Sequence, residues 1–171
     1  MRNLVISGGL QSDFHDGRSA GPLQRLPLAN EKLPDHGLSG ARILLLQDEF
    51  EQASVLEHVL RQQGCHVMVA RRVDKFFEMA LQMRPDLVVL HLVSSGIDGS
   101  ALCAALKTDH SVAAIPVIFM TGRADARTRV RSLAAGVVDH IQSPFDWREV
   151  LLRMRVYCGG RASGLAGRAI A

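Results

Sequence analysis

The chain has 171 residues, of which 47% are hydrophobic, and a formal net charge of +3. This length allows one domain of about 100–150 residues with tails, and the charge is too small to indicate a dedicated nucleic-acid-binding protein. The three cysteines are widely spaced and form no CxxC pair, which favours reduced thiols over disulfides or a zinc site. The apolar runs are too short for a signal peptide or a membrane span, so we expect a cytoplasmic protein without membrane association.

Composition divides the chain into three parts. Residues 1–40 are rich in glycine and proline and show no apolar periodicity, which predicts a flexible N-terminal extension. Residues 41–158 alternate apolar runs with amphipathic segments and form the predicted folded domain. Residues 159–171 are rich in Gly, Ala and Arg and are predicted to be a loose C-terminal tail.

The folded part alternates short apolar strands with amphipathic helices. In chain order, strands are predicted at 43–46, 65–69, 85–91, 115–120 and 137–141. Helices are predicted at 51–63, 73–83, 98–107, 125–135 and 146–157. The residues expected on their buried faces are Val55, Leu56, Val59, Leu60, Leu102, Leu106, Trp147, Val150, Leu151 and Met154.

Five strands joined to five helices by short connections predict an α/β fold with a parallel sheet covered on both faces. Right-handed crossovers favour a flavodoxin-like doubly wound sheet with strand order 2-1-3-4-5. In such sheets the functional crevice lies at the carboxyl ends of the strands, near the switch in strand order. Those ends carry Gln47-Asp48-Glu49, His91 and Thr121.

Four segments carry a family resemblance. They are Leu44-Leu45-Leu46-Gln47-Asp48-Glu49, the strand that ends in His91, Phe119-Met120-Thr121-Gly122 and Ile141-Gln142-Ser143-Pro144-Phe145. In this order and spacing they resemble the response-regulator receiver domains of bacterial two-component phosphorelay signalling, over Arg42 to about Tyr157. The resemblance implies a magnesium ion held by acidic residues and an aspartate that accepts a phosphoryl group from a histidine kinase. It also implies a hydroxyl residue that hydrogen-bonds the phosphoryl group, a lysine that supplies positive charge and an aromatic switch residue.

The chain departs from this pattern at several pocket positions. Asp48 and Thr121 match the family's second acidic residue and its hydroxyl residue, and Glu49 is ordinary there. Other positions differ, with a neutral amide at Gln47 for the first acid, an imidazole at His91 for the acceptor and a hydroxyl at Ser143 for the lysine. His140 stands where the family usually has Tyr or Phe as the switch residue. Phosphoryl transfer depends on positioning and charge neutralisation, so the resemblance predicts a degenerate pocket, or pseudo-receiver.

Several interpretations of His91 stay open. It could simply hydrogen-bond to Asp48 or Gln47 at the strand ends. It could join Asp48 and Glu49 in a weak divalent-metal site, since imidazole and carboxylate suit transition metals, or be phosphorylated itself. We expect no metal and no cofactor, and we expect Thr121 to be a strand-end hydroxyl without a switching role.

A basic run lies around the predicted helix 125–135 and consists of Arg123, Arg127, Arg129 and Arg131. A solvated helix face is the simplest interpretation of any single arginine. The receiver resemblance implies that this helix, the strand after it and the last helix form the surface that meets protein partners or a second copy in a homodimer. We therefore hypothesise a non-enzymatic signalling protein that binds a histidine kinase, another regulator or an effector without phosphorylation.

Two alternatives remain. The chain could be the regulatory receiver of an enzyme, such as a cyclic-dinucleotide synthase, whose catalytic part is not in this chain. It could also carry out phosphotransfer through a non-standard acceptor, Asp48 or a serine of Ser94-Ser95.

Overall fold

The computed structural model describes residues 36–47, 50–92, 96–122, 126–142 and 144–162. Five strands form one sheet in the order β2-β1-β3-β4-β5, and every neighbouring pair is parallel. Their bounds are β1 Arg42–Gln47, β2 His66–Ala70, β3 Leu87–His91, β4 Val117–Thr121 and β5 Asp139–Gln142. The predicted doubly wound α/β fold and its strand order are confirmed.

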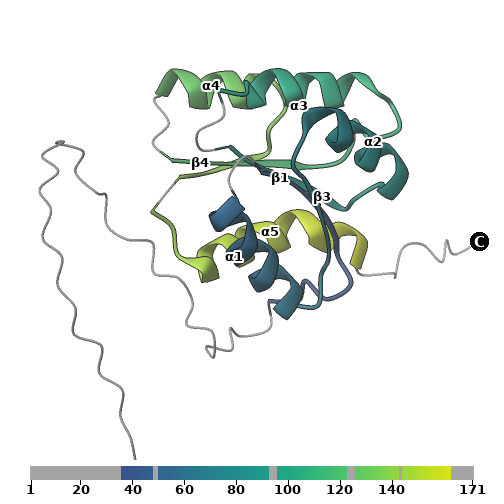
Figure 1. The fold of residues 1–171 in the computed structure, drawn as a ribbon, viewed down its shortest axis with the longest axis vertical. Helices are drawn as coiled ribbons and strands as arrows, with labels where there is room; N and C mark the ends of the chain where they lie inside the picture. The colour runs from purple at the N-terminus through teal and green to yellow at the C-terminus, as the bar shows by residue number, and fades with distance from the viewer. Residues whose placement is uncertain (1–35, 48–49, 93–95, 123–125, 143, 163–171) are drawn as a thin grey trace, which may run out of the picture.

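Helices cover both faces of the sheet. Their bounds are α1 Phe50–Gln62, α2 Val73–Met83, α3 Gly99–Thr108, α4 Ala126–Ala134 and α5 Trp147–Ala162. Figure 1 shows α2, α3 and α4 on one side of the sheet and α1 and α5 on the other. This two-sided cover is the physical reason why the strands are continuous apolar runs rather than alternating ones.

Successive strand residues enter two separate cores. In β1, Ile43 and Leu45 pack against α1 and α5, whereas Leu44 and Leu46 pack on the side of α2 and α3. This follows from the two-residue period of a strand. The buried faces predicted for α1, α3 and α5 are confirmed, and only Val55 is partly rather than fully buried.

Element ends differ from the prediction, most of them by one or two residues. Helix α5 continues to Ala162, four residues into the predicted tail. Strand β5 begins at Asp139, because the amide of Val137 donates to the carbonyl of Ser132 and its side chain turns into the core with α3. Apolar character alone does not separate a strand residue from a buried residue in the turn that precedes it.

The packed part of the chain begins before residue 41. Leu38 is 1% exposed and lies in the core with α1 and α5. The backbone amide of His36 donates to Oε1 of Gln63 at 2.9 Å, and the Cys65 thiol contacts the carbonyl of Leu38 at 3.5 Å. Residues 36–40, assigned to the extension from composition, therefore pack on the domain. Residues 1–35 lie outside the described ranges, and their role as an extension stays a prediction.

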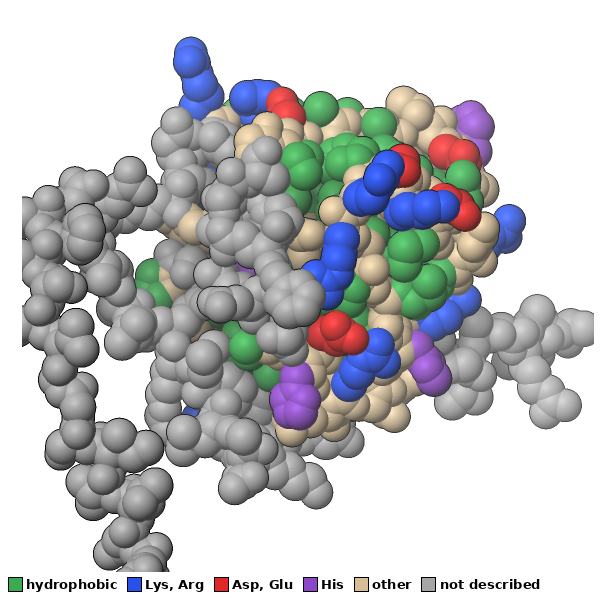
Figure 2. Space-filling model, viewed as in Figure 1, with side chains coloured by type: hydrophobic (Ala, Val, Ile, Leu, Met, Phe, Trp, Pro, Cys, Tyr) green, Lys and Arg blue, Asp and Glu red, His purple; other side chains and the backbone are tan. Residues whose placement is uncertain are grey.

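Charged side chains of both signs are interspersed on the surface. On the face drawn in Figure 2, basic and acidic groups lie next to one another rather than in separate areas. Pairs such as Arg61–Glu57 on α1 and Arg72–Asp74 at the start of α2 account for part of this mixture. In the part of the chain that the structure describes, no helix has the length and apolar character needed to cross a membrane.

Candidate signalling site at the carboxyl ends of the strands

Gln47 and His91 lie side by side at the centre of the sheet. They are register partners at the ends of β1 and β3, and the next partner across the sheet is Met120 on β4. Their side chains share a face with Met120, which belongs to the core of α1 and α5. Gln47 is 3% exposed and His91 5%, so the sheet holds an amide and an imidazole in a nearly dry environment.

The buried amide of Gln47 stands without a hydrogen-bond partner in the part of the chain that the structure describes. Neither Nε2 nor Oε1 has a hydrogen-bond partner among the described residues. A buried polar group without a partner costs about 1–3 kcal/mol. Its carbonyl oxygen and the neighbouring imidazole suit magnesium poorly, because that ion prefers several hard, charged oxygen ligands.

Asp48, Glu49 and Ser143 lie outside the described residues, as do Ser94 and Ser95. Within the described ranges, no group of three or more His, Cys, Asp or Glu side chains could hold a metal ion. The weak metal site proposed for Asp48, Glu49 and His91 therefore stays untested.

Thr121 and His140 are brought together by the pairing of β4 with β5. Oγ1 of Thr121 lies 2.8 Å from Nε2 of His140, and the other ring nitrogen, Nδ1, lies 3.5 Å from Oγ of Ser132 on α4. The imidazole also packs edge-on against Phe119, with ring centroids 5.4 Å apart. Burial and the positive charge of Arg129 lower the pKa of His140, while Asp139 opposes them.

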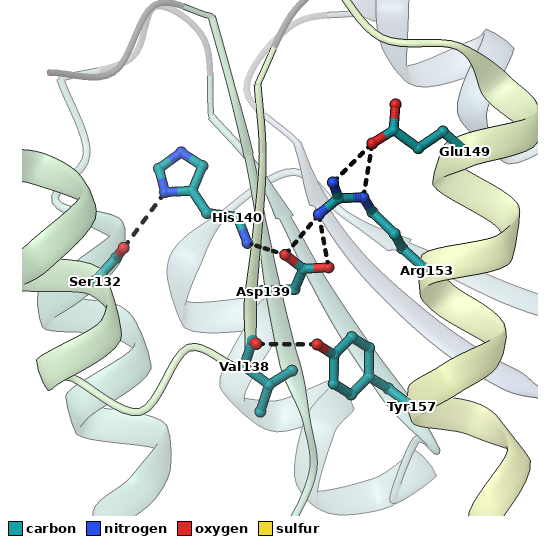
Figure 3. A network of polar contacts seen from close by, with 7 residues as sticks. All are labelled: Ser132, Val138, Asp139, His140, Glu149, Arg153 and Tyr157. Atoms are coloured by element: carbon teal, nitrogen blue, oxygen red, sulfur yellow. Dashed lines mark hydrogen bonds and ion pairs between the residues drawn. The ribbon is translucent and has the colours of Figure 1, made fainter. Parts of the chain in front are cut away.

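The neighbouring residue on β5 faces the other helix. Asp139 accepts hydrogen bonds from Arg153 on α5 at 3.0 and 3.2 Å, and Arg153 also pairs with Glu149 one turn earlier. Figure 3 shows His140 directed toward Ser132 and Asp139 directed toward Arg153, with the Tyr157 hydroxyl on the carbonyl of Val138. Alternation along β5 thus connects adjacent residues to opposite helices.

A groove follows the outer side of β5. It has a volume of about 430 Å³, and its walls include Arg129, Leu133, His140, Gln142, Phe145 and Arg153. Because β5 is an edge strand of the sheet, this groove lies between α4 and α5 and is open to solvent. We call it the β5 groove.

The described arginines of α4 divide between two sides of the helix. Nη2 of Arg129 donates to Oε1 of Gln142 on β5 at 3.0 Å. Arg131 instead pairs with Asp98, the N-cap of α3, at 2.6 Å. Arg127 is exposed and, being four residues earlier, shares the α3 side with Arg131. Arg123 lies outside the described residues.

Three contributors to this region were not singled out from the sequence. Asp139 lies on β5 and pairs with Arg153, and Ser132, which is completely buried, contacts His140. The spacing of Glu149 and Arg153 is a recognisable i, i+4 pair. Nothing local to Asp139 or Ser132 indicates its partner, because both contacts come from segments joined only by the fold.

With this geometry in place, comparison with known proteins identifies the family. The model of the response regulator receiver domain matches residues 43–155. The chain belongs to the response regulator receiver domain family.

Two curated relatives are regulators. The DNA-binding dual master transcriptional regulator RpaA of Synechocystis is 31% identical over 114 residues, which make up 67% of this chain and 47% of RpaA. The DNA-binding response regulator MtrA of Mycobacterium tuberculosis is 32% identical over 67% of this chain and 49% of MtrA. The chain spans about half the length of the curated relatives it matches.

A solved receiver shows the same architecture. The signal receiver domain of a signal transduction histidine kinase from Syntrophus aciditrophicus is 29% identical, with a TM-score of 0.65 over 77% of this chain and 98% of that one. The chain therefore carries the receiver domain of two-component response regulators, and the two curated relatives are named as regulators. Receiver domains act in signalling through histidine kinases and effectors.

Proposed function

We propose that this receiver domain is degenerate and acts in two-component signalling by phosphorylation-independent protein–protein interaction. The observation that supports this most strongly is His91 at the end of β3, buried and in register with Gln47. This is the position of the family's phospho-accepting aspartate. An imidazole has no carboxylate oxygen, so it cannot form the acyl phosphate that the family's chemistry uses.

The charges around this position support the same proposal. Phosphoryl transfer is catalysed by positioning and by neutralisation of the phosphoryl oxygens. Gln47 supplies an amide where the family has a metal-binding acid, and Ser143 supplies a hydroxyl where it has a lysine. The residues at these positions do not fit a magnesium ion, and we propose that none is held there.

The surface formed by α4, β5 and α5 is the proposed site of interaction. Among the described residues, seven large hydrophobic side chains are exposed, and five belong to this surface: Val130, Leu133, Val138, Leu152 and Val156. Two of them, Leu133 and Val138, line the β5 groove, and exposed apolar side chains that lie together indicate a protein partner. Candidate partners are a histidine kinase, another regulator, an effector or a second copy of the chain in a cytoplasmic complex.

Phosphorylation can be tested directly by intact mass. The chain is incubated with acetyl phosphate and magnesium, with an active receiver such as that of MtrA treated in parallel. We expect the control to gain about 80 Da, the mass of one phosphoryl group, and this chain to gain nothing. An adduct on this chain would overturn the proposal, and peptide mapping would then distinguish Asp48, Ser94 and Ser95 as acceptors.

A gain-of-function variant tests the rest of the pocket. His91→Asp restores the acceptor but leaves Gln47 and Ser143 unchanged. We expect this single variant to remain without efficient phosphorylation in the same mass assay. A triple variant that also carries Gln47→Asp and Ser143→Lys is the matched comparison and is expected to be modified. Strong labelling of the single variant would contradict the importance we assign to those two positions.

The alternative function, a receiver that regulates an enzyme on another chain, stays a hypothesis. The two curated relatives reported above are named as transcriptional or DNA-binding regulators, which does not favour an enzyme effector. Capture of partners from the native cell with the full chain as bait would distinguish these possibilities. Recovery of a nucleotide cyclase would support the alternative.

A further inference from the structure

His140 has a defined arrangement of hydrogen-bond donors and acceptors. The hydroxyl of Ser132 donates to the carbonyl of Arg129 at 2.9 Å, so its oxygen is left to accept from Nδ1 of His140. A neutral ring protonated at Nδ1 must accept at Nε2. The hydroxyl of Thr121, 2.8 Å away, is therefore the donor to Nε2.

A proton added to Nε2 reverses this last hydrogen bond. The imidazolium donates from both ring nitrogens and accepts from neither. The oxygen of Thr121 then becomes the acceptor, and its own proton must find another partner. The carbonyl of Gly122 lies 3.4 Å from that oxygen and is within reach. Protonation of His140 thus moves the hydroxyl proton of Thr121 toward the carbonyl of Gly122.

The new positive charge also acts on α4. Arg129 faces the ring from this helix and is anchored to β5 through Gln142. On the strand itself Asp139 carries a negative charge, but it already accepts from Arg153 of α5, which also pairs with Glu149. β4 contributes the uncharged groups Thr121 and Phe119. Repulsion between His140 and Arg129 therefore weakens the contact of α4 with β5.

We propose that His140 is a proton sensor. Its protonation reverses the hydrogen bond with the Thr121 hydroxyl and weakens the packing of α4 against β5 beside the β5 groove. The reaction is the reversible binding of one proton from solvent to Nε2, with no covalent change elsewhere. The ring is partly exposed, so solvent can deliver the proton. This inference stands independently of whether the domain is phosphorylated.

The direction of the pH effect follows from the ring's environment. Burial and Arg129 lower the pKa of His140 in the folded chain, whereas in the unfolded chain it stays near its usual value of about 6.5. Above that pH both states are neutral and the contact contributes fully. As pH falls below it, the unfolded chain binds the proton first, and stability is lost until the folded-state ring is protonated as well.

Nuclear magnetic resonance of the full ¹⁵N-labelled chain tests the inference. Long-range spectra of the imidazoles are recorded from about pH 8 to about pH 5, the range in which histidine changes charge. We expect His140 to carry its proton on Nδ1 at high pH. On acidification, the amide signals of Gly122 and Arg129 should shift with the midpoint of His140. A proton on Nε2 at high pH, or amide signals that do not follow His140, would overturn the proposal.

Variants separate His140 from the other histidines. His140→Gln keeps a polar side chain but cannot be charged, so the shifts at Gly122 and Arg129 should disappear. His66→Gln, on the exposed start of the opposite edge strand, should leave them unchanged. If His140→Gln does not fold, Thr121→Val provides the second test: His140 still titrates, but the shift at Gly122 is lost. Persistence of the Gly122 shift in His140→Gln or in Thr121→Val would exclude the mechanism.

Discussion

At the scale of single residues, polar side chains do two different jobs in this domain. Asp98 stabilises a helix end: its carboxylate accepts from the amides of Ser100 at 3.0 Å and Ala101 at 3.2 Å. The bond from Ala101, followed by the hydrogen bond and charge of Arg131 and then by the bond from Ser100, lowers the pKa of Asp98. His140 instead connects three elements, and burial, followed by the positive charge of Arg129, lowers its pKa.

Replacement of the α3 cap gives a prediction with a defined pH dependence. Asp98→Ala should lower the free energy of unfolding at pH 7 by about 0.5–2 kcal/mol, the usual value of an N-cap. Because the folded-state pKa lies below the unfolded value of about 3.9, the contribution is present above that pH and is lost as pH falls through the folded pKa. Urea unfolding of both proteins at pH 7 and at a pH below the folded-state pKa of Asp98 measures this difference. Asp98→Asn keeps the acceptor and should lose less, and equal losses in both variants would contradict the cap.

At the scale of elements, close packing of α3 on β4 positions the His140 ring. Gly99 opens α3 and is covered by the ring of Phe119, which itself lies edge-on against His140. A Cβ at Gly99 would overlap the Phe119 ring and approach Cδ1 of Leu92 at 3.0 Å. The absence of a side chain at one helix start therefore determines where an aromatic ring, and through it a histidine, can sit.

Gly99→Ala should be destabilising for this steric reason. Overpacking of a filled core typically costs about 1–3 kcal/mol, and displacement of Phe119 should also shift the imidazole signals of His140. Thermal unfolding and the histidine spectra measure the two effects. For the stability effect, Gly122→Ala is the matched control, because no atom of the described residues lies within 4 Å of a Cβ placed there. Similar losses in the two variants would show that packing against Phe119 is not the cause.

At the scale of the whole molecule, one edge of the sheet combines charge with exposed apolar side chains. The pairs of Asp139 with Arg153 and of Glu149 with Arg153 are satisfied within the chain. Arg129 donates to a neutral amide, that of Gln142 on β5. A partner on this surface would therefore meet apolar side chains with Arg129 at their border.

This division of the α4 arginines predicts unequal effects of charge reversal. Arg129→Glu should weaken self-association, or binding to a captured partner, by about tenfold, as expected for a charge at an interface border. Arg127→Glu changes the same charge on the α3 side of the helix and should have little effect. Light scattering after size exclusion, or titration calorimetry with the partner, measures both. Equal effects of the two variants would place the interface elsewhere.

The sequence by itself determined the parallel sheet, its order and the buried faces of the helices, because strand and helix periods are local and strongly patterned. It also pointed to Gln47, His91 and Thr121, since the carboxyl ends of parallel strands meet at one edge, and the receiver resemblance added His140. Only the tertiary structure decided that Leu38 packs in the core, that Arg129 and Arg131 serve different sides of α4, and that Thr121, His140 and Ser132 share one hydrogen-bonded bridge. Those contacts join segments far apart in the chain, and their geometry depends on strand register and helix rotation, which no local pattern specifies.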